Sequence, residues 1–248
     1  MKKFLLVSVL IILLLPGLAL ADLISFKIGY FIPRAQSDLW ETEFENMDLT
    51  RTNFQASNFA FTYEYFLSRQ ISLALSIDGY SKAKVGLYRG YVGYTDYDGE
   101  WAYPDEFTGE FQPAHTFNVS ITPVQVSLVL APMGRGAKII PYIGGGVGLY
   151  MWNVRLQGDM IDFSDPWYDT VNEATIYPIY LTDAREENKI SFGYHVLGGI
   201  MFPIAQRVSL GGEFKYNYAQ GTLTEAFEGF EPFDLSGYTI SIGLNYWF

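Results

Sequence analysis

Six ionisable residues lie in predicted β-strands, each on the face opposite the large apolar side chains of its strand. The set consists of Lys27, Glu64, Asp78, His195, Glu213 and Lys215. Each lies in a stretch where large apolar residues alternate with small or polar ones, as on the two faces of a β-strand. Charged groups removed from water are tolerated when they are paired and hydrogen-bonded. We therefore expect these residues to pair with one another in a polar network on a shared inner face.

This network has two interpretations. It is either a structural plug or a proton- or gate-like switch, since ionisable groups in such places can be functional. His195 is the inward-facing histidine, and one histidine with scattered carboxylates makes a poor metal site. We expect no metal and no cofactor. The other histidine, His115, lies at the junction of a loop and a strand. No His–Ser pair is visible on the lipid-facing surface, so catalysis is not expected.

The strand pattern is clearest in residues 237–248. Every second side chain is large and apolar, with aromatics at both ends and aliphatics between them: Tyr238, Ile240, Ile242, Leu244, Tyr246 and Phe248. This profile is typical of a strand that crosses a bilayer between two aromatic girdles. The chain ends on an aromatic residue, and we expect Tyr246 and Phe248 to act as an assembly signal.

Eight segments share this alternation, which predicts eight spanning strands. They are residues 23–32, 55–66, 70–80, 116–130, 139–153, 189–202, 207–219 and 237–248. The apolar phase changes at Pro123, which predicts a β-bulge there. Glycines at 144, 146 and 148 share one face and leave room inside a narrow lumen. The first and last strands are expected to close the ring.

The connections alternate in length and carry most of the acid. Short ones fall at residues 67–69, 131–138 and 203–206, whereas long ones fall at 33–54, 81–115, 154–188 and 220–236. The long connections hold every acidic residue except Asp22, Glu64, Asp78 and Glu213. They are also rich in aromatic residues, and exposed aromatics tend to mark contacts. We expect Trp40, Trp101 and Trp167 to make such contacts, in loops that are either functional or partly disordered.

Residues 1–21 have the pattern of a cleaved Sec-type signal peptide. Lys2 and Lys3 precede an apolar run, and Ala19-Leu20-Ala21 resembles a cleavage site. The remaining residues, 22–248, are expected to form one domain. The chain has no Cys and a formal net charge of −11, which argues against disulfides, thiolate metal sites and nucleic acid as a partner.

Two barrel architectures are compatible with this alternation, and they differ in which face of the sheet points outward. A soluble lipocalin-like barrel would turn its apolar face inward. Aromatics at the strand ends, glycine-rich opposite faces and the terminal Phe248 favour the reverse. We therefore predict an all-β fold: an eight-stranded antiparallel up-and-down transmembrane β-barrel with short periplasmic turns and long extracellular loops.

The residues that carry a family resemblance extend through the mature chain. They are the segments F-K-I-G-Y-F-I-P, P-Y-I-G-G-G-V-G-L-Y and G-G-E-F-K-Y-N-Y, together with the terminal Y-W-F. With the signal peptide, they resemble the small eight-stranded outer-membrane barrels of the OmpW- and OmpX-like type and the barrel domain of OmpA. The resemblance implies location in the outer membrane of a Gram-negative bacterium. It also implies contact with membrane lipids, including lipopolysaccharide, and with the barrel assembly machinery.

The resemblance leaves the role open. The leading hypothesis is surface interaction or envelope integrity through the acidic, aromatic loops, with an extracellular ligand. The alternative is a narrow, porin-like conduit for small hydrophobic solutes. A lipid A-modifying enzyme is a further alternative, with little support from the two histidines.

Overall fold

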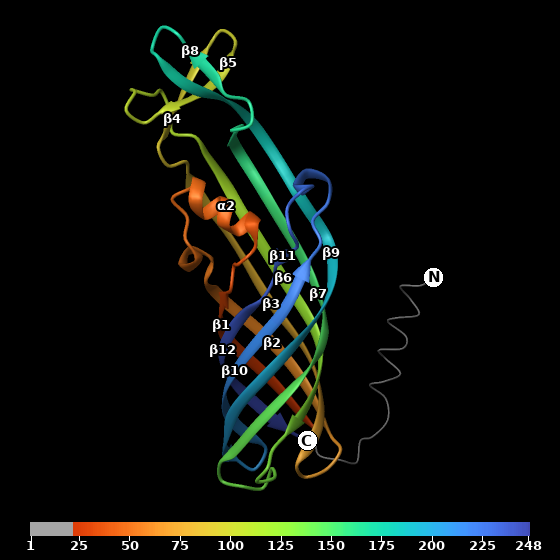
Figure 1. Cartoon of the computed structure of the whole chain (residues 1–248). Coiled ribbons are helices and arrows are strands. Elements are labelled where there is room, and N and C mark those ends of the chain that lie inside the picture. Colours follow the sequence, from red (N-terminus) through yellow and green to blue (C-terminus); the bar gives the residue numbers. More distant parts are fainter. Residues whose placement is uncertain (1–21) are drawn as a thin grey trace.

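A single antiparallel sheet is wound into a closed ring. The computed structural model describes residues 22–248, so the predicted signal peptide lies outside the described residues. The ring consists of β1 (Leu23–Pro33), β2 (Ala56–Phe66), β3 (Ile71–Leu87), β6 (Ala114–Leu130), β7 (Ile140–Ile161), β9 (Ala174–Ala205), β10 (Val208–Gly221) and β12 (Gly237–Trp247). Figure 1 shows its tilted strands around one axis. The prediction of an eight-stranded antiparallel barrel is confirmed.

The first and last strands close the ring, as predicted. Leu23 pairs with Trp247, and the ladder continues without interruption to Pro33 and Gly237. Because every strand has two partners, the ring leaves no unpaired edge within its closed part, which a strand in lipid requires. Among the described residues, no helix is long and apolar enough to cross a bilayer.

The outer surface of the closed ring is apolar. Phe26 and Phe59 are about two-thirds exposed, and Ile242 is 73% exposed. Water would not favour so many large apolar side chains on one continuous surface, whereas hydrocarbon does. This band of outward-facing apolar residues is the part of the ring that meets lipid.

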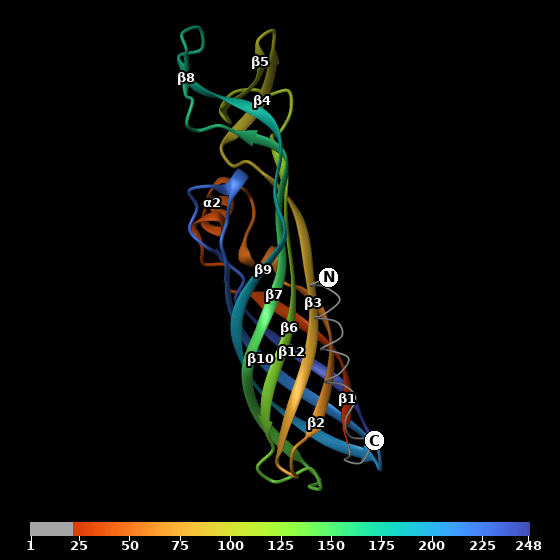
Figure 2. The same cartoon turned by 90° about the vertical axis from the view of Figure 1, so that its right-hand side faces the viewer.

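Four of the ring strands, β3, β6, β7 and β9, continue well beyond the band (Figure 2). Smaller elements join them there: α2 (Asp38–Asn46), the 3-10 helices η1 (Arg51–Phe54) and η2 (Glu225–Phe227), and the strands β4 (Tyr91–Asp96), β5 (Gly99–Pro104), β8 (Trp167–Asp169) and β11 (Phe233–Asp234). The long connections are therefore folded, and partial disorder is not what the structure shows. We call this region the extracellular extension.

The predicted bulge at Pro123 is wrong. β6 pairs with β7 in one unbroken register from His115 to Leu130. What changes is the surroundings of each face. Inside the band the outward residues, such as Val126, are apolar, whereas in the extension the inward residues, such as Phe117 and Val119, are apolar and buried. The change of apolar phase in the sequence marks the point where β6 leaves the membrane.

The extension has its own aromatic core, centred on Trp40 of α2. Its ring lies 4.8 Å from that of Phe117, 5.0 Å from Phe54 and 5.2 Å from Phe233, between ring centroids. Its indole nitrogen Nε1 donates to the carbonyl of Asp234 at 3.1 Å. Trp40 is 1% exposed. The prediction that Trp40 makes an external contact is therefore wrong, because this side chain fixes α2 and β11 to the inner face of β6.

Replacing Trp40 by Ala should release the loops of the extension while leaving the barrel intact. Truncating a buried Trp costs about 3–5 kcal/mol, and no lipid-facing residue is touched. We expect external protease to cleave residues 34–55 of Trp40→Ala on whole cells, with normal heat-modifiable gel mobility of the barrel. Trp101→Ala is the control and should resist the protease. Equal resistance of both variants would contradict the assigned core.

Candidate functional site

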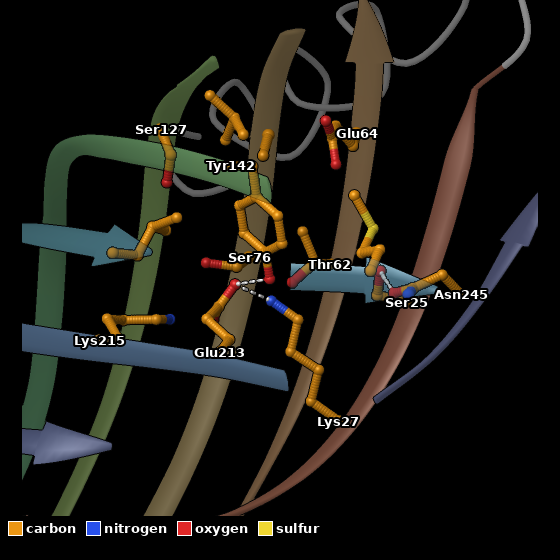
Figure 3. A pocket seen from close by; sticks show the side chains of 14 residues that line it. Ser25, Lys27, Thr62, Glu64, Ser76, Ser127, Tyr142, Glu213, Lys215 and Asn245 are labelled. Atoms are coloured by element: carbon orange, nitrogen blue, oxygen red, sulfur yellow. Dashed lines mark hydrogen bonds and ion pairs between the residues drawn. The ribbon is translucent and has the colours of Figure 1, made fainter. Parts of the chain in front are cut away.

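The lumen of the ring is filled by polar side chains in ion pairs (Figure 3). Lys27 on β1 places Nζ 2.6 Å from Oε2 of Glu213 on β10, and the hydroxyl of Tyr142 donates to the same oxygen at 3.1 Å. Further along, Lys215 Nζ lies 2.7 Å from Oδ2 of Asp78. The side chains of Glu213, Lys215 and Asp78 are buried, and that of Lys27 is 12% exposed. Each charge therefore depends on its partner in the pair in place of water.

A hydrogen-bonded layer continues from the pair of Lys215 and Asp78. Lys215 also donates to the Gln125 side-chain oxygen at 3.1 Å, and Gln125 Nε2 donates to Asn217 Oδ1 at 2.7 Å and to the Tyr150 hydroxyl at 2.8 Å. Glycines make room for the rings: a Cβ on Gly199 would lie 2.4 Å from the ring of Tyr142. At the predicted Gly146 the close neighbour is instead the backbone of β6, because a Cβ there would lie 1.9 Å from the Val126 carbonyl oxygen.

The other predicted network residues have partners outside the predicted set. Glu64 binds Arg135, which enters the lumen from the turn between β6 and β7, and it also accepts from Ser72. Arg135 lies 4.3 Å over the ring of Phe66. His195 Nε2 lies 2.7 Å from the hydroxyl of Ser127. Sequence reasoning missed Arg135 because a turn residue carries no strand periodicity.

Little space is left inside. The cavity in Figure 3, between Glu64 and Lys215, has a volume of about 30 Å³, and a second one beside Asp78 and Tyr150 has about 10 Å³. A water molecule occupies roughly this much space. The aromatic core around Trp40 then closes the extracellular end. The arrangement suits a plug better than an open channel.

The far end of the extension presents aromatic side chains to solvent. The β4–β5 hairpin pairs with β9 next to β8, which brings Trp101 and Trp167 to a centroid distance of 5.3 Å in an edge-on contact. Trp167 is 55% exposed, and the neighbouring Tyr97 and Tyr168 are also exposed. We call Trp101, Trp167, Tyr97 and Tyr168 the aromatic tip. The structure brings two of the three predicted contact tryptophans together here.

Polar contacts hold the tip and the loops in place. The hydroxyl of Tyr103 donates to Asp169 Oδ2 at 3.0 Å, and partial burial followed by this carboxylate raises the pKa of Tyr103. Asp96 Oδ1 accepts from Trp101 Nε1 at 3.2 Å and from two backbone amides of its own turn. The acidic stretch around Asp96 is thus occupied in shaping the turn.

Loop 4, residues 222–232, is fixed to β9 by Glu186. One carboxylate oxygen accepts from the amide of Thr224 at 2.6 Å, and the other lies 2.7 Å from Lys189 Nζ. Burial by itself would raise the pKa of Glu186, but the bonds from Lys189 and Thr224 outweigh it and lower that pKa. The carboxylate therefore stays ionised at neutral pH and holds the loop.

A closed antiparallel ring with an apolar outer band and a paired, charged interior defines a transmembrane β-barrel of the outer-membrane type. Outer-membrane proteins are among the solved structures that resemble it. The outer membrane protein OprG from Pseudomonas aeruginosa matches 92% of this chain and 95% of its own, with 11% identity and a TM-score of 0.50. This likeness shows a shared fold.

Two further matches have lower TM-scores. Neisserial surface protein A (NspA) is 14% identical over 92% of this chain and 97% of its own, with a TM-score of 0.46. The outer membrane protease OmpT from Escherichia coli is 12% identical over 92% and 96%, with a TM-score of 0.37. No family model and no curated protein matches the chain. A shared fold does not assign a function, so the role must be argued from the residues.

Breaking the pair of Lys215 and Asp78 should destabilise the barrel strongly. Removing one partner of a buried pair leaves an uncompensated charge and costs about 3–5 kcal/mol. We expect Lys215→Met to lower the urea midpoint of unfolding in lipid vesicles, and Lys215→Met combined with Asp78→Asn to recover part of the loss. Arg155→Met is the control, since its pair with Asp183 is exposed and such pairs contribute about 0.2–1 kcal/mol. Equal losses for Lys215→Met and Arg155→Met would rule out this role.

Proposed function

We propose that this chain is an integral protein of the bacterial outer membrane whose extracellular extension binds a partner at the cell surface through the aromatic tip. The observation that carries the proposal is the contact between Trp101 and Trp167, two tryptophans from separate hairpins, of which Trp167 is exposed and Trp101 half-buried. Large aromatics held on ordered strands give contact area at a low entropic cost. In this proposal the barrel is the anchor, embedded in outer-membrane lipids including lipopolysaccharide.

The charge of the tip indicates the chemistry of the partner. The sequence has no Lys or Arg in residues 90–134 or 156–184, whereas Asp96, Asp98, Glu100, Asp165 and Glu173 lie in those ranges. A surface of aromatics and carboxylates favours a basic or neutral partner and repels polyanions. The attraction to a basic partner should weaken with added salt, because exposed charges are screened.

The two other roles have less support. Passage of solutes through the lumen would require the ion pairs of Lys27 and Lys215 to separate and the core around Trp40 to open. A catalytic role would need a base and a nucleophile that a substrate can reach. His115 is bonded to Glu43, and the pair of Ser127 and His195 is buried inside the lumen. Surface binding needs no such rearrangement, because the residues of the aromatic tip are already accessible.

Removing both tip tryptophans should abolish partner binding without unfolding the barrel. We expect the Trp101→Ala/Trp167→Ala protein in nanodiscs to bind an array of basic, aromatic peptides at least about tenfold more weakly than wild type, a loss of about 1.4 kcal/mol. The matched control is Met133→Ala, because Met133 is 70% exposed at the opposite end of the molecule. Unchanged binding by the double variant, or equal loss in the control, would defeat the proposal.

We also propose that residues 1–21 are removed on export and that Tyr246 and Phe248 are read by the barrel assembly machinery. The Phe248 ring is 54% exposed, and it packs edge-on against Tyr246 at 5.3 Å. Its backbone amide donates to Asp22 at 2.9 Å, so β12 is paired to its last residue. The side chain itself has little to do in the folded ring.

Deleting Phe248 should therefore impair assembly in cells while leaving the stability of the folded barrel almost unchanged. We expect the deletion to reduce the amount of heat-modifiable protein in the outer membrane several-fold, while refolding of purified protein into detergent stays close to normal. Phe26→Ala is the control, since Phe26 is lipid-facing and 64% exposed but is not terminal. Normal insertion of the deleted protein in cells would show that Phe248 is not an assembly signal.

A further inference from the structure

A cleft in the extracellular extension is separate from both the lumen and the aromatic tip. It lies between α2, the inner faces of β7 and β9, and loop 4, and has a volume of about 550 Å³. Its walls are mostly apolar and include Leu39, Leu156, Met160, Ile161, Phe227 and Phe230. This size and lining are those of a small-molecule site.

One acidic side chain, Glu43 of α2, lines the cleft and is 5% exposed. Its Oε2 lies 2.6 Å from His115 Nε2, and His115 Nδ1 lies 3.2 Å from the carbonyl oxygen of Asp159. Both ring nitrogens of His115 are therefore occupied, one by the Glu43 side chain and the other by the Asp159 carbonyl. Within residues 22–248, Glu43 Oε1 has no protein donor, which leaves it to accept a hydrogen bond from the cleft.

The charges around the cleft select the class of ligand. Its lining contains the acids Glu43 and Asp183 and, among the described residues, no Lys or Arg. Asp183 is already paired with Arg155, at 2.6 Å. The Asp159 carboxylate beside His115 accepts from the amide of Ala114 at 3.1 Å and adds negative charge. An anionic ligand would be repelled, whereas a donor with a positive charge would bond to Glu43 Oε1.

The walls are fixed before any ligand arrives. The amide of Asp38 on α2 donates to the Glu231 carboxylate at 3.1 Å, and the amide of Glu231 donates back to Asp38 at 2.9 Å. Glu186 holds the other end of loop 4 to β9. Because both ends of loop 4 are held by hydrogen bonds, a ligand that binds in the cleft loses little free energy to ordering of the loop.

We propose that this cleft is a binding site for a small apolar amine, with the hydrocarbon part against the Phe227 and Met160 wall and the ammonium group on Glu43. The site does not rest on partner binding by the aromatic tip, and either can fail alone. It is a site and not the mouth of a channel, because the core around Trp40 lies between the cleft and the lumen.

The test uses methionine methyl groups as local reporters in protein labelled with ¹³C-methyl Met in nanodiscs. Met160 lines the cleft, whereas Met133 and Met151 lie elsewhere and are 70% and 39% exposed. The probes are 2-phenylethylamine and 3-phenylpropionate, which differ mainly in the charge of the head group. We expect the amine to shift Met160 in a saturable way, with at least about tenfold tighter binding than the carboxylate, equivalent to 1.4 kcal/mol.

Two variants with the same side-chain change provide the control. Ala184→Phe fills the cleft from the inner face of β9, where Ala184 lines it, and should abolish the Met160 response. Ala83→Phe places the same group on the exposed outer face of β3 and should leave it unchanged. Glu43→Gln should remove the preference for the amine.

Specific outcomes would overturn the proposal. Shifts of Met133 and Met151 without a saturable shift of Met160 would mean that the probe only partitions into the lipid. A Met160 response that survives Ala184→Phe would place the probe outside the cleft. Equal affinity for the two probes would refute the selection for an amine.

Discussion

The narrow interior of the eight-stranded ring is the constraint on which the rest of the structure depends. A ring of this size has room for its own side chains and little else, and any charge placed inside must find its partner there. Lys27 with Glu213, Lys215 with Asp78, and Arg135 with Glu64 meet that requirement at successive positions along the lumen. Filling the lumen in this way stabilises the ring and leaves only small cavities, of about 30 Å³ and 10 Å³, between the side chains.

The same strands meet the opposite requirement once they leave the membrane. β6 keeps one register throughout, yet its inward side chains change from Gln125 and Ser127 to Phe117 and Val119. Where the sheet is surrounded by lipid, apolar side chains are favoured on its outer face. Where it is surrounded by water, they are favoured on its inner face. One continuous sheet therefore builds a membrane anchor and a water-exposed extension, with the reversal as its boundary.

The sequence was sufficient for the ring because period-two alternation reports directly which face of a strand meets lipid. Strand count, closure of β1 on β12 and the inward direction of Lys27 or Glu213 all follow from it. Arg135 and Trp40 could not be placed that way, since both lie outside the spanning strands and their partners are distant in the chain. The bulge predicted at Pro123 was wrong for a related reason. A change of apolar phase looks the same in the sequence whether the surroundings of the strand change or its register shifts.

Because the lumen is filled, the binding that we propose uses surface that the fold leaves accessible outside it. The extension is ordered by backbone pairing, by the core around Trp40, and by the ties from Glu186 and Asp38 to loop 4. That ordering is complete before a partner arrives, so contacts at the aromatic tip or in the cleft are not offset by the entropy of folding a loop. A barrel with short, flexible loops would be anchored in the membrane equally well. It would present neither two tryptophans in contact nor a carboxyl group lining an apolar cleft.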